Sequence, residues 1–284
     1  MAKLPNTLDE LRREIDAIDD RLHELIVQRT AVVRRIAEIK GKGPVLRPGR
    51  EARILRHRLS VAAGDPLPAA VFARVWRELI SAYCRLQGPL QVAVCAPVKS
   101  VGYWDLARDH FGSATKMGLF HSPTLVLRAV SETKGMVGLL PMPHDDDTDP
   151  WWRHLATGPE PSLRVVARLP FTANPGARFE DLQAVVVARV AEEDSGDDVS
   201  WLVVSVENRI SRRSLNDLAQ GVDFDAQVLA GHDEGSGAGY FFLLEVAGHV
   251  GRDDARLARL TDKLKAARGR VTPVGAYARP QADA

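Results

Sequence analysis

A few polar side chains interrupt an apolar helical stripe, and they are the first candidates for chemistry. Arg29 stands where the spacing of 3 and 4 residues places the next apolar residue after Leu25. Lys40 follows eleven residues later, about three helical turns, and projects from nearly the same face. A cation in a helical seam is costly unless it meets an anion. The pair can therefore line a pocket for an anionic ligand.

Other polar positions point to the same kind of pocket. Arg12 lies about 80–100° away from Arg29 and Lys40 around the helix, so it can serve only the equivalent pocket of an antiparallel partner chain. Gln87 continues a stripe that includes Tyr83, and a polar amide there predicts an inward hydrogen bond. Glu51 suits the start of a second helix, whereas its neighbour Arg50 does not.

These residues alone leave two alternatives to the anion pocket open. A single arginine in a seam can extend its charge to solvent or fix helix register, and a basic helical hairpin can bind nucleic acid. Nucleic-acid binding is the least favoured, because the cations at 29 and 40 point inward. A further set of arginines is expected to form a solvated face: Arg34, Arg35, Arg53, Arg56 and Arg58.

Three helices must position these side chains. A nine-residue apolar stripe predicts a first helix that ends before Gly41: Leu8, Leu11, Ile15, Ile18, Leu22, Leu25, Val32, Ile36 and Ile39. Thr7 and Glu10 have the spacing of a capping box at its start. A helix of this length spans roughly 50 Å, which favours pairing with a second chain. A second helix is expected from about 50 to 63 and a third from about 68 to 87.

After Pro89 the hydrophobic period changes to that of an α/β region. Strands are expected at 90–94, 136–140, 163–169, 184–190, 201–206, 227–229 and 240–246, and helices at 103–111, 214–220 and 254–267. Residues 145–152 are expected to form an acidic loop. The last elements follow the ferredoxin-like order, with 184–190 as a possible extra strand. The expected domains are 1–90, 91–180 and 181–284.

Composition narrows the class of protein. The chain of 284 residues is 45% hydrophobic and 26% charged, which is ordinary for a soluble globular protein. Residues 1–90 carry 17 Lys and Arg against 11 Asp and Glu, a net +6, while the remainder carries −5. Cys84 and Cys95 cannot build a disulfide framework, and no apolar run approaches the ~18 residues of a membrane span. We expect a cytoplasmic protein with no membrane partner, and His232 with Asp233 to lie in a flexible loop rather than a metal site.

The first ninety residues resemble a known family. The segment Leu8-Asp9-Glu10-Leu11-Arg12-Arg13-Glu14-Ile15-Asp16-Ala17-Ile18-Asp19 is similar to the opening of the AroQ-class chorismate mutases. The family's later arginine, lysine, Arg-Pro-x-Arg-Glu loop and final glutamine correspond here to Arg29, Lys40, Arg47-Pro48-Gly49-Arg50-Glu51 and Gln87. The resemblance implies an intertwined all-helical homodimer that converts chorismate to prephenate in phenylalanine and tyrosine biosynthesis. This rearrangement is unimolecular and implies no cofactor, metal or nucleophile.

The resemblance also implies roles for the site residues. Arg29, together with Arg12 from the partner chain, binds the two substrate carboxylates. Lys40 and Gln87 face the breaking ether oxygen, Glu51 takes the ring hydroxyl, and Arg50 supports the site. Tyr83 stands where the family often has a small polar residue. It either hydrogen-bonds the substrate or narrows the pocket.

The rest of the chain resembles prephenate dehydratase. Residues 240–249 with Val274-Gly275-Ala276-Tyr277 are similar to the end of its ACT-type regulatory module. Val92-Ala93-Val94-Cys95-Ala96-Pro97 is similar to its first strand and loop, and Gly138-Leu139-Leu140-Pro141 to the strand before its Pro-Ile-Glu-Asn motif. The whole chain is thus similar to a fused chorismate mutase–prephenate dehydratase.

The dehydratase motifs themselves are missing. The first loop reads Ala96-Pro97-Val98-Lys99-Ser100-Val101-Gly102, Met142-Pro143-His144 replace Glu-Asn, and Leu182-Gln183-Ala184 replace Thr-Arg-Phe. The interval after the strand near 165 is too short for the family's second lobe. Effector segments have also changed, to Arg213-Ser214-Leu215 and to residues 229–233. We expect a non-catalytic, structural or regulatory C-terminal half. A bifunctional enzyme, or a non-catalytic regulator that senses an amino acid or binds a partner, remains the alternative.

Overall fold

A computed structural model describes residues 7–41, 43–96, 101–158, 162–173, 178–179, 181–191, 193–235 and 239–281. The first region consists of three helices, α1 (Leu8–Lys40), α2 (Pro48–Val61) and α3 (Ala69–Gln87). The capping box at α1 is confirmed, because the Glu10 N–H donates to Thr7 Oγ1 at 3.2 Å and the Thr7 N–H donates to Glu10 Oε2 at 3.0 Å. The all-helical N-terminal region expected from the sequence is present.

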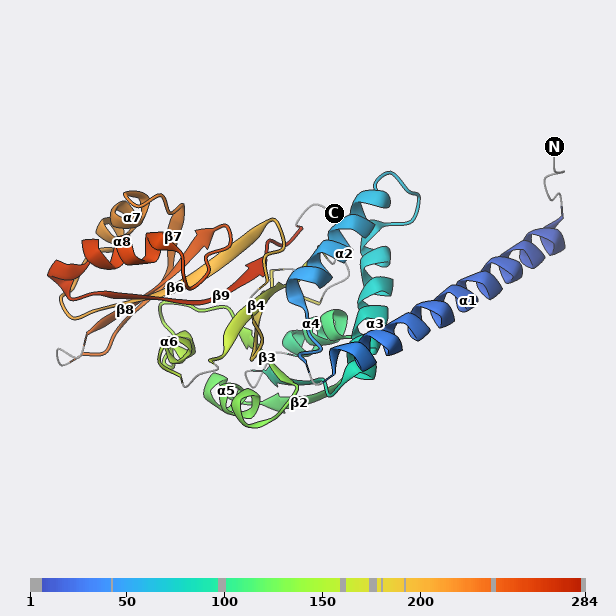
Figure 1. The fold of residues 1–284 in the computed structure, drawn as a ribbon, viewed down its shortest axis with the longest axis horizontal. Coiled ribbons are helices and arrows are strands. Elements are labelled where there is room, and N and C mark those ends of the chain that lie inside the picture. The colour runs from blue at the N-terminus through green and yellow to red at the C-terminus, as the bar shows by residue number, and fades with distance from the viewer. Residues whose placement is uncertain are drawn as a thin grey trace.

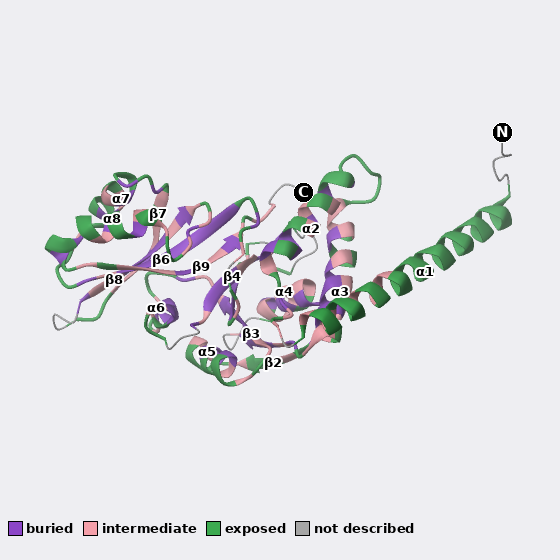
Figure 2. Ribbon diagram, viewed as in Figure 1, coloured by how far each residue is buried: buried purple, intermediate pink, exposed green. Residues whose placement is uncertain are grey.

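Helix α1 projects away from the rest of the chain (Figure 1). None of its 33 residues is buried, and Figure 2 shows it exposed along its length. Its apolar stripe is therefore uncovered, as the 58% exposure of Leu25 and the 50% exposure of Ile18 illustrate. Only the C-terminal part of α1 packs near α3, where Thr30 Oγ1 lies 3.3 Å from the Tyr83 hydroxyl.

Residues 91–188 form an α/β region on a mixed sheet. Its elements are β1 (Gln91–Cys95), α4 (Gly102–Phe111), β2 (Lys116–Phe120), α5 (Pro123–Glu132), β3 (Met136–Pro141), η1 (Trp151–Arg153), α6 (His154–Thr157), β4 (Arg164–Leu169) and β5 (Ala184–Ala188). Strand β1 pairs in parallel with β2 and β3, while β5 runs antiparallel between β3 and β4. The extra strand near 184 thus joins this sheet, although it follows the boundary expected near residue 181.

The last module contains β6 (Asp198–Val206), α7 (Arg212–Gln220), β7 (Ala226–Asp233), β8 (Tyr240–Ala247), α8 (Ala255–Lys263), η2 (Lys265–Ala267) and β9 (Arg270–Ala278). Its strands lie in the order β9-β6-β8-β7, and each neighbouring pair is antiparallel. This is a ferredoxin-like arrangement. Strand β7 extends to Asp233, so the loop expected at His232 and Asp233 is wrong.

One nine-stranded sheet joins the two α/β parts, in the order β2-β1-β3-β5-β4-β9-β6-β8-β7. The junction is a parallel pairing of β4 with β9 in which Val165 faces Gly275. Gly275 has φ of +140°, and a Cβ there would lie 2.2 Å from the Val165 carbonyl oxygen. A glycine is therefore required for β9 to approach β4 so closely.

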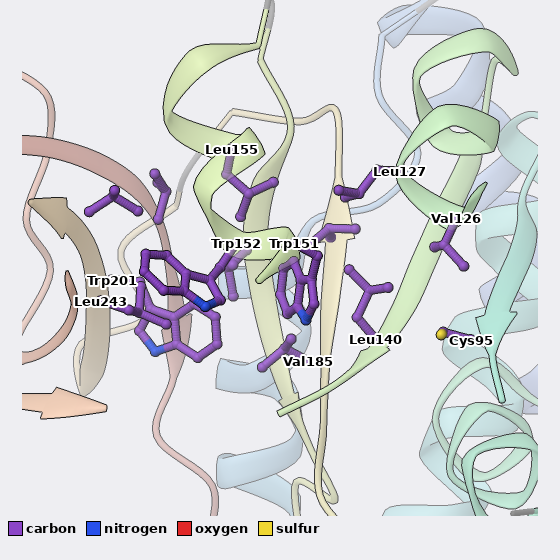
Figure 3. Close-up of a cluster of buried hydrophobic side chains, with 14 of the residues drawn as sticks. Cys95, Val126, Leu127, Leu140, Trp151, Trp152, Leu155, Val185, Trp201 and Leu243 are labelled. Carbon is purple, nitrogen blue, oxygen red and sulfur yellow. The ribbon is translucent and has the colours of Figure 1, made fainter. Parts of the chain in front are cut away.

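A shared hydrophobic core reinforces this junction. Trp151 and Trp152 are 1% and 0% exposed and pack with residues of both α/β parts. Figure 3 shows them between Trp201 and Leu243 on one side and Leu140 on the other. The ring centroids of Trp151 and Trp201 lie 6.3 Å apart. The expected acidic loop at 145–152 is thus wrong at its end, because the tryptophans start a short helical segment that anchors the core.

Candidate active site

Arg29 and Tyr83 form the first half of the candidate site. The Arg29 guanidinium lies 4.4 Å from the centre of the Tyr83 ring, and Tyr83 is 5% exposed. Arg29 Nη1 is buried and has no hydrogen-bond partner among the described residues. A buried guanidinium nitrogen without an acceptor is costly. The position is therefore suited to an anion that is supplied from outside the chain.

Gln87 is the last residue of α3, and Lys40 is the last residue of α1. The Gln87 side-chain amide donates to the Tyr83 carbonyl oxygen at 3.1 Å, within α3. The Lys40 ammonium donates to the Pro44 carbonyl oxygen, across the turn that follows α1. Gln87 also lines a cleft of about 1010 Å³ together with Gly41 and Gly43. Within the described residues, the hydrogen bonds of both polar groups thus go to nearby backbone carbonyls, which a substrate can replace.

Glu51 and Arg77 form the second half of the candidate site as a buried ion pair. Arg77 Nη1 lies 3.1 Å from Glu51 Oε2, and each residue is 7% exposed. Glu51 Oε1 also accepts from the Arg47 N–H at 3.2 Å. Burial lowers the pKa of Arg77, while the charge of Glu51 opposes that shift. The Glu51 carboxylate is therefore paired with the Arg77 guanidinium. Arg77 is a residue that was not predicted from the sequence.

Arg77 could have been found by the argument that identified Arg29. The buried face of α3 includes Ala73, Arg77, Ile80 and Cys84, which repeat at spacings of 4, 3 and 4. A cation at the second of these positions interrupts the apolar stripe in the same way as Arg29 does in α1. The sequence reasoning followed the neighbouring stripe through Tyr83 instead.

The Cys84 thiol connects the two halves of the site. Its Sγ lies 3.9 Å from Glu51 Oε1, and its pKa is raised by burial first and then by the charge of Glu51. Arg77 and Lys40 act on the same thiol in the opposite direction. The Cys84 thiol thus lies next to the Glu51 carboxylate, and its raised pKa favours the neutral form. Cys84 directly follows Tyr83 on α3.

Arg50 and Arg12 stand apart from this set. Arg50 is exposed, and its backbone N–H donates to Glu193 Oε2 at 3.4 Å. The Arg12 side chain is 66% exposed and pairs with Asp9 at 3.4 Å. Because it precedes Arg29 by 17 residues, Arg12 lies about 25 Å away along the helix axis. One chain thus gathers Arg29, Lys40, Glu51, Tyr83 and Gln87, but not Arg12.

The expected solvated face is wrong for Arg56 and Arg58, which are partly buried, whereas Arg53 is exposed as expected. The Arg58 guanidinium lies 5.0 Å from the centre of the Trp76 ring. Arg53 Nη1 donates to the Asp194 carbonyl oxygen at 3.1 Å, and Arg56 Nη1 donates to Ser195 O at 3.0 Å. Arg56 is partly buried by this contact. The spacing within α2 cannot reveal partners that are about 140 residues away in the sequence.

His110 on α4 borders Arg77 and supplies a pH-dependent prediction. Burial, and then the charge of Arg77, lower the pKa of His110 well below 6.5. The unfolded chain therefore binds a proton below pH 6.5 that the folded chain does not, so stability is present above pH 6.5 and falls as the pH drops. We expect the free energy of unfolding to decrease by up to about 1.4 kcal/mol per pH unit from this group.

Urea unfolding of the wild type and of His110→Asn between pH 7.5 and pH 5.5 measures this effect. The variant should lose stability less steeply than the wild type over that interval. Equal slopes in the two proteins would contradict a His110 that stays neutral in the folded chain.

The positions that replace the dehydratase motifs lie around the sheet. Met142, Pro143 and His144 follow β3, and Gln183 accepts from Arg168 Nη2 at 2.7 Å. The altered first loop falls partly at 97–100, outside the described residues. Between β4 and β5, the described residues contain no helix or strand element, and Thr172 forms a single bridge with Gln281.

Two features are absent from the parts of the chain that the structure describes. No group of three or more His, Cys, Asp or Glu side chains is arranged to hold a metal ion there. None of the described helices is both long and apolar enough to cross a membrane. Cys84 and Cys95 are buried free thiols.

Two bifunctional chorismate mutase/prephenate dehydratases are similar in sequence. The protein of Pseudomonas aeruginosa is 33% identical over 142 residues, which cover 48% of this chain and 38% of that protein. The protein of Neisseria gonorrhoeae is 36% identical over 115 residues, which cover 39% and 31%. The matches thus span less than two fifths of each relative.

Solved structures of prephenate dehydratases are similar to this chain, at low sequence identity. The one from Streptococcus mutans has a TM-score of 0.46 and 13% identity, covering 68% of this chain and 100% of that chain. The one from Arthrobacter aurescens, solved with L-Phe, has a TM-score of 0.47 and 13% identity, covering 67% and 90%.

The N-terminal helices match a family model directly. The model for chorismate mutase type II covers residues 11–88, which include the whole of α2 and α3 and all of α1 but its first turn. The site residues gathered by one chain all lie within this range. Residues 11–88, the helical part of the chain that precedes the mixed nine-stranded sheet, thus match the model of the chorismate mutase type II family.

Proposed function

We propose that this chain is a chorismate mutase that converts chorismate to prephenate. The observation that carries the proposal is the buried and unsatisfied Nη1 of the partly buried Arg29, inside a region that matches the chorismate mutase type II family. A dicarboxylate substrate supplies the anion that this position lacks. Lys40, Glu51 and Gln87 then add further polar groups for the substrate.

The reaction breaks the ether C–O bond and forms a new C–C bond within one molecule. No proton, electron or group has to be exchanged with the protein, so the site acts by holding the reactive conformer and by stabilising charge on the ether oxygen. In this proposal Arg29 and Arg12 of the partner subunit bind the two carboxylates. Lys40 and Gln87 donate to the ether oxygen, for which Lys40 has to release its contact with the Pro44 carbonyl.

Glu51 accepts the hydrogen bond of the ring hydroxyl, and Arg50 supports the site from the edge of α2. Tyr83 narrows the pocket through its ring, which stacks against Arg29. The test is an assay of the purified full chain with chorismate. Prephenate should accumulate as chorismate disappears, and a rate equal to the uncatalysed background would end the proposal.

The proposed assembly is a homodimer in which α1 pairs with the partner's α1. Two observations support it: the uncovered apolar stripe of α1 and the distance between Arg12 and Arg29 within one chain. An antiparallel partner covers the stripe and carries its own arginine toward the opposite site. A second chain also explains the length of α1, which exceeds what three packed helices of this size need.

Mixing two inactive variants tests the shared site. Arg12→Ala and Arg29→Ala should each be inactive alone. In a mixed dimer, one site loses both arginines and the other keeps both. If subunits exchange at random, about half of the dimers are mixed, and activity should return to about a quarter of the wild-type value. No recovery after verified subunit exchange would show that each site takes both arginines from one chain.

We further propose that the α/β half does not dehydrate prephenate. The replaced motifs at 142–144 and 182–184 support this reading, as does the connection between β4 and β5, in whose described residues no helix or strand element occurs. Appearance of phenylpyruvate from supplied prephenate would contradict it and favour the bifunctional alternative suggested by the names of the relatives.

A further inference from the structure

Helix α2 carries Arg50 and Glu51 but lacks a cap of its own. Its N-cap residue, Arg47, makes no side-chain capping hydrogen bond. The N–H of the third helical residue, Arg50, donates instead to Glu193 Oε2 at 3.4 Å, from 143 residues away in the sequence. A carboxylate at this place satisfies a free N–H group and faces the positive end of the helix dipole.

The same carboxylate group also fixes the residue before the helix. Arg47 Nε pairs with Glu193 Oε1, while the Arg47 N–H donates to Glu51 Oε1 at 3.2 Å. Glu193 is thus one contact away from the Glu51 carboxylate, through Arg47, and in direct contact with the Arg50 backbone. The side chain of Glu193 is 19% exposed, which limits screening of these contacts by water.

The backbone of α2 packs closely against residue 193 at Gly49. A Cβ at Gly49 would lie 2.7 Å from the Glu193 carbonyl oxygen and 2.8 Å from the Glu193 Cβ. The next turns of α2 dock on the same segment through Arg53, which reaches Asp194 O, and Arg56, which reaches Ser195 O and Asp197 O. Residues 193–197, here named the docking segment, therefore hold α2 along its first three turns.

The docking segment is itself fixed to the sheet. Asp198, 3% exposed at the start of β6, accepts from the Ser195 N–H at 2.8 Å and from Ser195 Oγ at 2.6 Å. The Gly196 N–H donates to Asp194 Oδ1 at 2.7 Å. A segment held by its own hydrogen bonds can transmit the position of β6 to α2.

We propose that Glu193 is a positioning residue of the mutase site, so that the C-terminal half completes the site rather than merely following it. This proposal rests on the proposed function, because it concerns the placement of Arg50 and Glu51 for chorismate. Glu193 touches no substrate. It sets the first turn of α2, and through Arg47 it sets the direction of the Glu51 carboxylate.

The test compares Glu193→Ala, Glu193→Gln and the control Glu207→Gln in the full chain. Glu207 pairs with Arg268 on the surface of the last module, away from α2. We expect Glu193→Ala to lower kcat/KM for chorismate about tenfold, and Glu193→Gln, which keeps an acceptor for the Arg50 N–H, to recover about half of this loss on a logarithmic scale. Glu207→Gln should match the wild type.

Two readouts separate positioning from a general loss of structure. Urea unfolding of the Glu193 variants should give midpoints high enough that both proteins are fully folded under assay conditions. Amide hydrogen exchange should become faster at Arg50 in Glu193→Ala, while the core strand β6 stays protected. An alanine variant with wild-type kcat/KM, or a glutamine variant no better than alanine, would overturn the proposal.

The exchange measurement also distinguishes this proposal from the proposed function. If the wild type does not convert chorismate, the proposed function fails, yet faster exchange at Arg50 in Glu193→Ala would still show that Glu193 caps α2. If the wild type is active and exchange at Arg50 is unchanged in the variant, the positioning role fails alone.

Discussion

Replacing Arg29 by alanine is expected to lower kcat/KM for chorismate by a factor of about a hundred to several thousand. Removing one member of a buried charge pair costs about 3–5 kcal/mol, and each 1.36 kcal/mol of transition-state stabilisation is about a factor of ten in rate. The partner that is lost here is the substrate carboxylate. The effect should appear in steady-state assays of the full chain at saturating and at low chorismate.

The same substitution should leave the stability of the free protein nearly unchanged. Arg29 Nη1 is buried without a hydrogen-bond partner among the described residues, so its removal relieves a cost in the unliganded chain. Loss of the contact with the Tyr83 ring, worth about 0.5–2 kcal/mol, acts in the opposite direction. An arginine nitrogen that lacks a hydrogen-bond partner until the ligand binds is typical of functional positions, where stability is lowered in favour of activity.

Arg35→Ala is the matched control, because Arg35 is an exposed arginine on the same helix. It should keep wild-type kcat/KM. If Arg29→Ala lost activity only in proportion to its unfolded fraction in a thermal melt, Arg29 would be a structural residue and not a carboxylate ligand.

The helical region could be predicted well from the sequence because its signals are local. The capping box at Thr7 and the glycine after Lys40 define both ends of α1, and α3 ends at Gln87 as the pattern predicts. A stripe that repeats every 3.6 residues also identifies which positions face inward. The same stripe predicts that Arg29 faces a neighbouring element, and Arg29 contacts the Tyr83 ring of α3.

Long-range pairings could not be predicted from such signals. Nothing in the spacing of α2 indicates that Arg56 meets Ser195, or that Gly275 meets Val165 across the sheet. The tryptophans at 151 and 152 follow an acidic, proline-containing segment that is typical of a loop, and only the tertiary core explains their burial. Arg56 and Gly275 meet residues more than 100 positions away, and Trp151 packs near Trp201, 50 positions away, so a local pattern carries no information about these contacts.

Arg77 presents a different case, because it lies in a local pattern and decides stability rather than substrate binding. Replacing Arg77 by methionine should cost about 3–5 kcal/mol, since Glu51 is 7% exposed and would keep a buried charge without its cation. Methionine preserves much of the side-chain volume, so a cavity contributes little. Urea unfolding at pH 7.5, where His110 stays neutral, measures the change.

The double variant Glu51→Gln/Arg77→Met separates the two roles of the pair. A neutral amide next to methionine leaves no buried charge, so most of the stability lost in Arg77→Met should return, with a coupling energy of about 2 kcal/mol or more in the double-mutant cycle. Activity should not return with it, because the proposed ligand of the ring hydroxyl is the Glu51 carboxylate itself. Additive losses of stability would instead show that the two side chains act independently. A double variant that is stable but inactive would show that the fold does not need the Glu51 carboxylate. Arg77 would then serve to hold this carboxylate for the substrate.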